Sequence, residues 1–110
     1  MKQAELNKFI REYFDPYKKR APGHIVHDPG TTKEHRGLVN NICEWANENS
    51  YTYFTRVFLK KGKIADIVIP GLPYPFIEVR HSEKKKEKLY LEEYEKLTKF
   101  VDTEDPYRLT

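Results

Sequence analysis

Hydrophobic and polar positions recur with two different periods along this chain, and these periods divide it into helices and strands. Apolar residues return every three or four positions over 2–14 and again over 31–49, which is the spacing of one face of an α-helix. Over 51–60 the side chains alternate every second position, and aromatic and β-branched residues favour a strand. The first 60 residues therefore predict two amphipathic helices followed by a strand.

Two shorter apolar segments, 63–69 and 76–81, follow this strand. Lys61 and Gly62 predict a tight turn before the first segment. The connection over 70–75 contains three prolines and a glycine, which exclude a helix and favour a turn. The pattern therefore predicts three antiparallel strands in a meander.

A last helix is predicted from Ser82 to Val101. Ser82 is a favourable N-cap, and Glu83 in the first turn complements the helix dipole. The apolar residues over this stretch recur at helical spacing: Tyr90, Tyr94, Leu97 and Val101. Together the elements predict one α+β (α/β) domain over 1–110, with an additional N-terminal helix at 1–16 and a core at 31–101.

Composition agrees with a single folded domain. The chain has 110 residues, of which 38% are hydrophobic and 14% aromatic, and a disordered chain would contain fewer of both. The formal net charge of +3 permits an anionic partner. Cys43 is the single cysteine, so no internal disulfide forms, and no apolar run approaches the ~20 residues of a membrane span. We therefore expect a soluble, cytoplasmic protein without a membrane partner.

The predicted meander carries one acid on each of two neighbouring strands. If the 70–75 loop is symmetric about Leu72, Asp66 lies opposite Glu78, with Cβ atoms roughly 4.5–5.5 Å apart. Two carboxylates this close repel each other unless a positive group lies between them. One interpretation is a divalent cation bound by both acids. The other is a buried salt bridge from Arg80 to one of them, and residue chemistry alone does not separate the two.

Glu34, at the start of the second predicted helix, also has two interpretations. Thr31 and Glu34 have the spacing of a capping box, in which the acid supports the helix N-terminus. Because Glu34 lies one turn before Leu38, it leans toward the buried side and could act as a third acid beside Asp66 and Glu78. Spacing alone favours the capping role.

Two basic segments are candidates for contacts with phosphates. The first lies in the loop after the N-terminal helix, and the second in the first turn of the last predicted helix. Such segments are often only solvated, but they can also contact a phosphodiester backbone. The candidate nucleic-acid-binding residues are Lys18, Lys19, Arg20, Lys84 and Lys85.

The order of these elements and acids resembles the PD-(D/E)XK nuclease superfamily. The segments 34–45, 65–69 and 77–82 are similar to the nuclease domain of competence-protein-type members. The segment 87–100 is similar to the region after the catalytic strand in archaeal Holliday junction resolvases. The resemblance covers 31–101.

The resemblance implies a restriction-endonuclease-like core, in which a central mixed sheet with a three-strand antiparallel meander is flanked by helices. It implies a DNA nuclease in which Asp66 and Glu78 bind Mg²⁺ (or Mn²⁺) and Glu34 adds an outer ligand. Two positions depart from the signature, since Ala65 replaces its proline and Arg80 replaces its lysine.

Arg80 decides what such a site can do. Arginine stays protonated, so Arg80 cannot act as a general base, but it can stabilise the phosphate in the transition state. We therefore expect a Mg²⁺-dependent nuclease, acting as a homodimer because cleavage of both DNA strands needs two sites. The alternative is a non-catalytic nucleic-acid-binding relative, in which Arg80 forms a salt bridge with Asp66 or Glu78.

Overall fold

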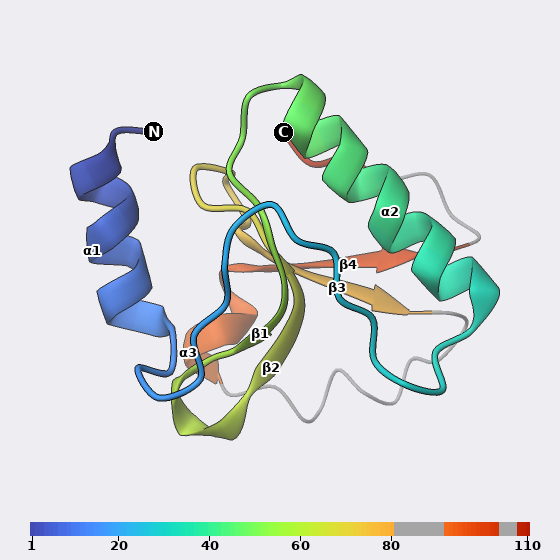
Figure 1. Ribbon diagram of the computed structural model, residues 1–110, viewed down its shortest axis with the longest axis horizontal. Coiled ribbons are helices and arrows are strands. Elements are labelled where there is room, and N and C mark those ends of the chain that lie inside the picture. Colours follow the sequence, from blue (N-terminus) through green and yellow to red (C-terminus); the bar gives the residue numbers. More distant parts are fainter. Residues whose placement is uncertain (81–91, 104–107) are drawn as a thin grey trace.

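The protein is built on a four-stranded mixed sheet. The computed structural model describes residues 1–80, 92–103 and 108–110. The sheet has the strand order β1-β2-β3-β4; the first three strands are antiparallel, and β4 runs parallel to β3 (Figure 1). The strand bounds are β1 (Phe54–Phe58), β2 (Ile64–Val68), β3 (Phe76–Arg80) and β4 (Thr98–Asp102). The predicted meander is confirmed, with shorter strands than the alternation suggested.

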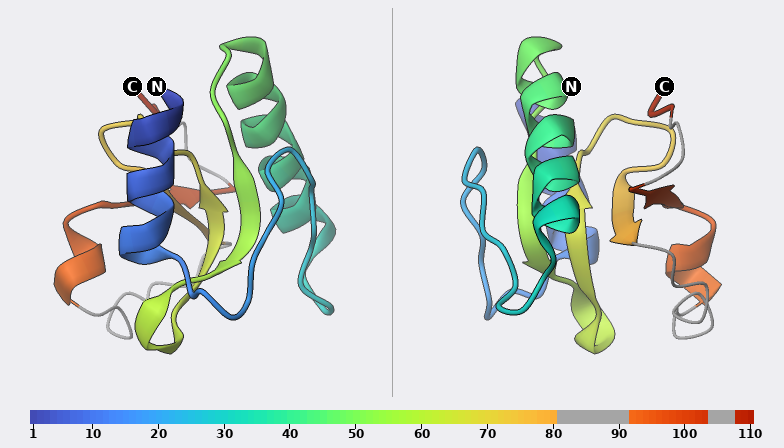
Figure 2. Two further views of the ribbon diagram at one scale, coloured as in Figure 1. Left: turned by 60° about the vertical axis from the view of Figure 1, so that its left-hand side comes forward. Right: turned by 90° about the vertical axis from the view of Figure 1, so that its right-hand side faces the viewer.

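Helices cover both faces of this sheet (Figure 2). The helix bounds are α1 (Gln3–Tyr13), α2 (Lys33–Glu48) and the short α3 (Glu92–Glu95). The apolar stripe of α2 packs with Ile67, Ile77 and Val101 on one face. Apolar residues of α1 pack on the other face against the inward side chains of β1 and β3. A small α+β domain with a mixed sheet is therefore confirmed.

The turns between the strands set the register that brings the acids together. The turn over Lys60–Gly62 joins β1 to β2, and Lys61 and Gly62 within it have positive φ, at 66° and 78°. Across the next loop, Ile67 pairs with Ile77 and Val68 pairs with Phe76. These pairs are symmetric about Leu72, so the condition for placing Asp66 opposite Glu78 is met.

Within the described residues, the end of the predicted last helix is wrong. Residues 98–102 form β4, in which each residue pairs with a residue of β3. Helical spacing of Tyr94, Leu97 and Val101 suggested a continuous helix, but pairing with the open edge of β3 outweighs it, since Thr98 and Val101 become buried on the sheet. Ser82, Lys84 and Lys85 lie outside the described residues.

The N-terminus of α2 also differs from its prediction by one residue. The N-cap is Thr32, whose hydroxyl accepts the N–H of His35 at 3.1 Å. The hydroxyl of Thr31 instead donates to the Asp28 carbonyl at 2.9 Å, which closes the turn before the helix. Glu34 is therefore the second helical residue rather than the third, and the predicted capping box is wrong.

The described residues contain no helix with the length and apolar character needed to cross a membrane.

Phe76 joins α1 to the sheet and to α3. Its ring is almost fully buried, with 1% exposed, and lies 5.7 Å from Phe9, 5.2 Å from Tyr13 and 5.6 Å from Tyr94, measured between centroids. Substitution Phe76→Ala should lower the free energy of unfolding by about 3–5 kcal/mol, because it leaves a cavity among these rings. Urea unfolding followed by circular dichroism measures this loss.

The matched control is Tyr74→Ala in the neighbouring loop, where the side chain is half exposed. This control should change stability by less than about 0.5 kcal/mol. Equal losses for the two variants would contradict the packing of α1 against β3.

Candidate functional site

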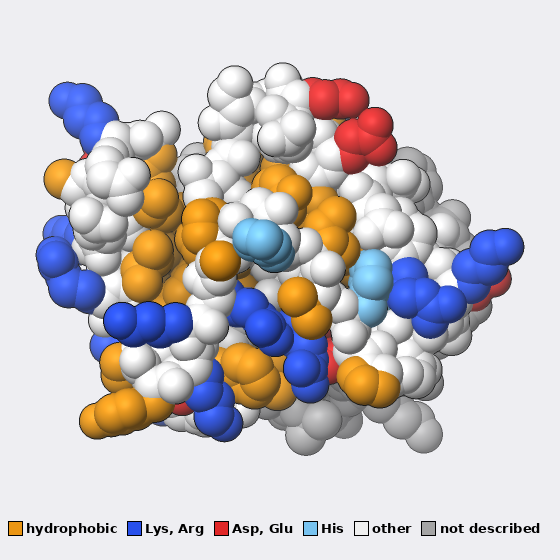
Figure 3. Space-filling model, viewed as in Figure 1, with side chains coloured by type: hydrophobic (Ala, Val, Ile, Leu, Met, Phe, Trp, Pro, Cys, Tyr) orange, Lys and Arg blue, Asp and Glu red, His pale blue; other side chains and the backbone are white. Residues whose placement is uncertain are grey.

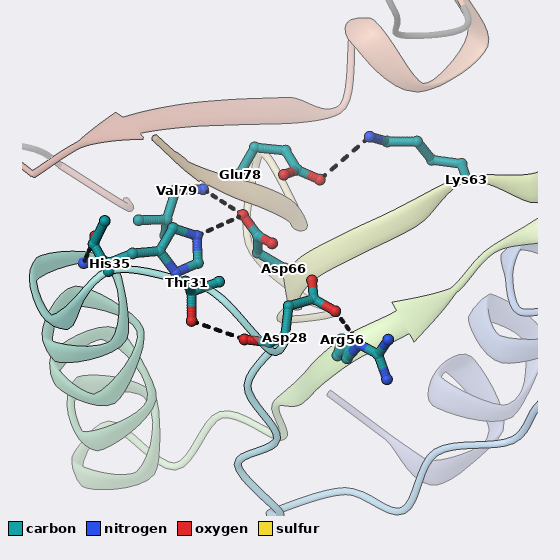
Figure 4. A network of polar contacts seen from close by, with 9 residues as sticks. Asp28, Thr31, His35, Arg56, Lys63, Asp66, Glu78 and Val79 are labelled. Atoms are coloured by element: carbon teal, nitrogen blue, oxygen red, sulfur yellow. Dashed lines mark hydrogen bonds and ion pairs between the residues drawn. The ribbon is translucent and has the colours of Figure 1, made fainter. Parts of the chain in front are cut away.

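The candidate site forms where β2 and β3 separate. The last ladder pair on this side is Ile67 with Ile77. One residue further, the Asp66 side chain takes over the role of a ladder partner, since its Oδ2 accepts the N–H of Val79 at 2.9 Å (Figure 4). The carboxylate therefore holds the two strands together while keeping their backbones apart, and a cleft opens beside it.

This cleft has a volume of about 560 Å³. Its wall combines residues of β2 and β3 with the turn that leads into α2. The lining residues are Asp28, Pro29, Gly30, Thr31, Thr32, His35, Asp66, Glu78, Val79 and Arg80. Three of the four residues predicted for catalysis, Asp66, Glu78 and Arg80, therefore meet in one cleft.

Asp66 accepts several hydrogen bonds in the cleft. Burial on its own would raise the pKa of this carboxyl group. Hydrogen bonds with His35, Glu78 and the Val79 N–H outweigh burial and hold the pKa of Asp66 below its ordinary value. The closest approach of His35 is 3.4 Å, between Nε2 and Oδ2. Asp66 is therefore held in its charged form.

Glu78 has a cation of its own. The Lys63 ammonium lies 3.4 Å from Glu78 Oε1, and both side chains are largely buried, at 17% and 15% exposed (Figure 4). Arg80, two residues further along β3, lines the cleft and places its guanidinium 5.1 Å from the centre of the Phe100 ring. The cleft therefore combines two acids with the cation Arg80 of β3, and one of these acids also contacts Lys63, the residue before β2.

Helix α2 brings His35 to the cleft rather than Glu34. His35 lies on the stripe that continues through Val39, Ile42 and Ala46, all buried against the sheet. Glu34 is rotated by about 100° from His35 around the helix axis, and its side chain is exposed to solvent. The sequence analysis missed His35, although its spacing to the buried Val39 and Ile42 could have indicated that it faces the sheet. No comparable signal marked Lys63.

Arg56 distorts β1 beside Asp66. Its φ is 45°, a left-handed value that costs a non-glycine residue about 1–3 kcal/mol. Phe54 and Val57 consequently pack on the same face of the sheet, although a regular strand would place them on opposite faces. The Arg56 guanidinium forms an ion pair with Asp28, at the rim of the cleft (Figure 4).

The first basic segment lies beside β1. Lys18 and Lys19 are exposed and Arg20 is half-buried. The Lys18 ammonium and the Arg20 guanidinium lie 4.8 and 5.8 Å from the centre of the Phe58 ring. These residues do not line the cleft, and a role in binding nucleic acid stays a prediction.

Within 1–80, 92–103 and 108–110, no group of three or more His, Cys, Asp or Glu side chains is arranged to hold a metal ion. The acids Asp66 and Glu78 still form a donor pair of two carboxylates. Mg²⁺ commonly uses one or two protein carboxylates and completes its shell with water and substrate phosphate. The donor pair therefore fits Mg²⁺ better than a zinc ion, which takes three or four protein ligands.

Comparison of the chain with family models, with curated proteins and with solved structures finds no match. Membership of the PD-(D/E)XK superfamily therefore stays a prediction.

Neutralising Asp66 should destabilise the protein in a pH-dependent way. The pKa of Asp66 is lower in the folded protein than in the unfolded chain, so its carboxylate contributes fully above the unfolded value of about 3.9. This contribution is lost as the pH falls through the folded pKa. Asp66→Asn should therefore cost about 1–3 kcal/mol at neutral pH, and the cost should shrink below about pH 4.

Urea titrations of wild type and variant across this range measure the difference in unfolding free energy. Glu44→Gln, on the exposed side of α2, is the matched control and should have little effect at any pH. An Asp66→Asn protein as stable as wild type at neutral pH would show that the cost of burial outweighs the hydrogen bonds.

Proposed function

We propose that this protein is a divalent-cation-dependent nuclease that hydrolyses phosphodiester bonds of DNA. The observation that carries this function is the meeting of Asp66 and Glu78, from neighbouring strands, in one open cleft with Arg80. A catalytic cation between two carboxylates is a common way to hydrolyse a phosphodiester. The four-stranded mixed sheet with helices on both faces supports the restriction-endonuclease-like fold that the resemblance implies.

In this scheme, Asp66 and Glu78 hold the Mg²⁺ ion. When bound, the ion neutralises charge on the phosphate and lowers the pKa of the attacking water. His35 contacts Asp66 and thereby fixes the direction of its carboxylate. Arg80 supplies a permanent positive charge for a phosphate oxygen, and it does not exchange protons.

Lys63 has an amine that can exchange a proton, which the guanidinium of Arg80 cannot do. Its ammonium lies 3.4 Å from Oε1 of Glu78, which lines the cleft. A lysine next to a metal-binding acid can orient the attacking water or exchange a proton with it. We therefore assign this role to Lys63 rather than to a residue of the 84–85 segment.

The same function includes two further elements. Each chain contributes one such cleft, so cleavage of both strands of a duplex would use a homodimer. DNA as substrate also implies a cytoplasmic location, in agreement with the lone, buried Cys43. Glu34 is exposed in this structure, and its role as an outer ligand stays a prediction.

A second candidate function is DNA binding without catalysis. His35 and Lys63 already place positive or proton-donating groups on Asp66 and Glu78, so the acids can be satisfied without a metal ion. In that case the site is structural, and the protein retains salt-dependent DNA binding.

A cleavage assay on single-stranded, duplex and branched DNA separates these functions. With Mg²⁺ or Mn²⁺, wild type should cut at least one substrate, and chelation should stop the reaction. Asp66→Asn and Glu78→Gln should each reduce the rate by about a hundredfold or more, since each removes a ligand for the charge-neutralising ion. The exposed Glu44→Gln variant should cut like wild type.

Equal inactivity of wild type and Asp66→Asn on all of these substrates would refute the nuclease function. DNA binding that persists under those conditions would establish the second candidate.

A further inference from the structure

Three cations surround the ring of Phe58 on the outer side of β1. The Lys18 ammonium and the guanidinium carbons of Arg20 and Arg56 lie 4.8, 5.8 and 5.7 Å from the ring centre. These distances are within the range of cation–π contacts. Figure 3 shows Lys and Arg side chains gathered on this face, over β1 and the loop between α1 and α2. We call Lys18, Arg20, Arg56 and Phe58 the Phe58 cluster.

Backbone contacts fix this cluster in place. The N–H of Asp15 donates to the Phe58 carbonyl at 2.9 Å, which ties the end of α1 to β1. Arg20 Nε donates to the Arg56 carbonyl at 3.1 Å, which ties the loop to the same strand. Arg20 and Arg56, which also pairs with Asp28, are therefore held by the fold, so these two side chains lose little freedom when an anion binds them.

The acids near the cluster do not cancel its charge. Asp28 forms an ion pair with Arg56, and the Asp15 carboxylate accepts the N–H of Tyr17 at 2.8 Å. The basic side chains outnumber these two acids; they are Lys18, Lys19, Arg20 and Arg56. A surface with this imbalance attracts a polyanion.

The cluster is continuous with the candidate cleft. Asp28 lines the cleft and pairs with Arg56 of the cluster. A second cavity of about 10 Å³ is lined by Asp28 and Arg56 together with His35 and Asp66. An anionic chain that leaves the cleft over Asp28 therefore reaches the cluster directly.

We propose that the Phe58 cluster is the surface that holds the DNA strand next to the scissile phosphate, through contacts of Lys18, Arg20 and Arg56 with the backbone. This inference rests on the proposed nuclease function, since it assigns the path of the substrate. Cations lie on the ring of Phe58, so the ring acts by holding them and not by stacking on a base. The cluster therefore binds backbone phosphates without sequence preference.

Binding of a labelled single-stranded oligonucleotide in the presence of EDTA tests this surface separately from catalysis. Fluorescence anisotropy at several salt concentrations gives both the affinity and its salt dependence. The double variant Lys18→Gln with Arg20→Gln should bind at least several-fold more weakly. The slope of log affinity against log salt should fall by about 1.4, because each phosphate that is no longer neutralised lowers it by about 0.7.

The matched control removes two exposed lysines outside the cluster, with Lys8→Gln and Lys96→Gln in one protein. It carries the same change in net charge, so a surface of uniform attraction would respond equally to both double variants. The cluster predicts that the control keeps nearly the wild-type slope.

Phe58→Leu and Phe58→Tyr test the ring. Leucine keeps an apolar side chain but removes the π face, so binding should weaken several-fold; tyrosine keeps the face and should bind like wild type. Thermal unfolding of both variants checks that the fold is retained. If Phe58→Leu does not fold, the Lys18 and Arg20 double variant alone decides.

Equal losses in the two double variants, or no binding of the oligonucleotide at low salt, would overturn the assignment. Tighter binding to phosphatidylserine vesicles than to DNA would also overturn it, because the surface would then fit a membrane. Absence of cleavage by wild type, together with the predicted binding results, would refute the nuclease function and leave this surface intact.

Discussion

The structure depends on one hydrogen bond, from the Val79 N–H to the carboxylate of Asp66. At this point the β2–β3 ladder ends, and a buried N–H without an acceptor would cost about 1–3 kcal/mol. A side-chain oxygen satisfies that N–H while leaving the backbones apart. The same carboxylate also contacts His35 on α2, so it links both strands to the helix. This one hydrogen bond therefore both opens the cleft and places a charged acid in its wall.

Each of the two acids in the cleft has a partner that is positively charged or can donate a proton. His35 contacts Asp66 at 3.4 Å, and Lys63 contacts Glu78 at 3.4 Å. These contacts permit two uses of one arrangement. In the first use, Asp66 and Glu78 would bind a divalent ion in addition to these partners. In the second, the two acids would only stabilise the fold. Arg80 suits both uses, because its charge does not depend on pH near neutrality.

The sequence was sufficient to predict features that depend on local chemistry. Turn residues predicted the loop over 70–75, and a register symmetric about Leu72, which was posed only as a condition, brings Asp66 and Glu78 together. It was not sufficient for β4, because a parallel strand is selected by a distant partner, and helical spacing of a few apolar residues over 94–101 was misleading. The only sequence feature that could have indicated His35 is its helical spacing to the buried Val39. Lys63 and the strained Arg56 carried no local signal, since tertiary packing determines their contacts.

The central claim is that Asp66 and Glu78 together bind a divalent cation. Titration with Mn²⁺, with the free ion measured by electron paramagnetic resonance, tests it without requiring a substrate. Wild type should bind one Mn²⁺ per chain at this site, and the double variant Asp66→Asn with Glu78→Gln should lose that ion while Glu44→Gln retains it. Identical Mn²⁺ binding by wild type and the double variant would contradict the claim.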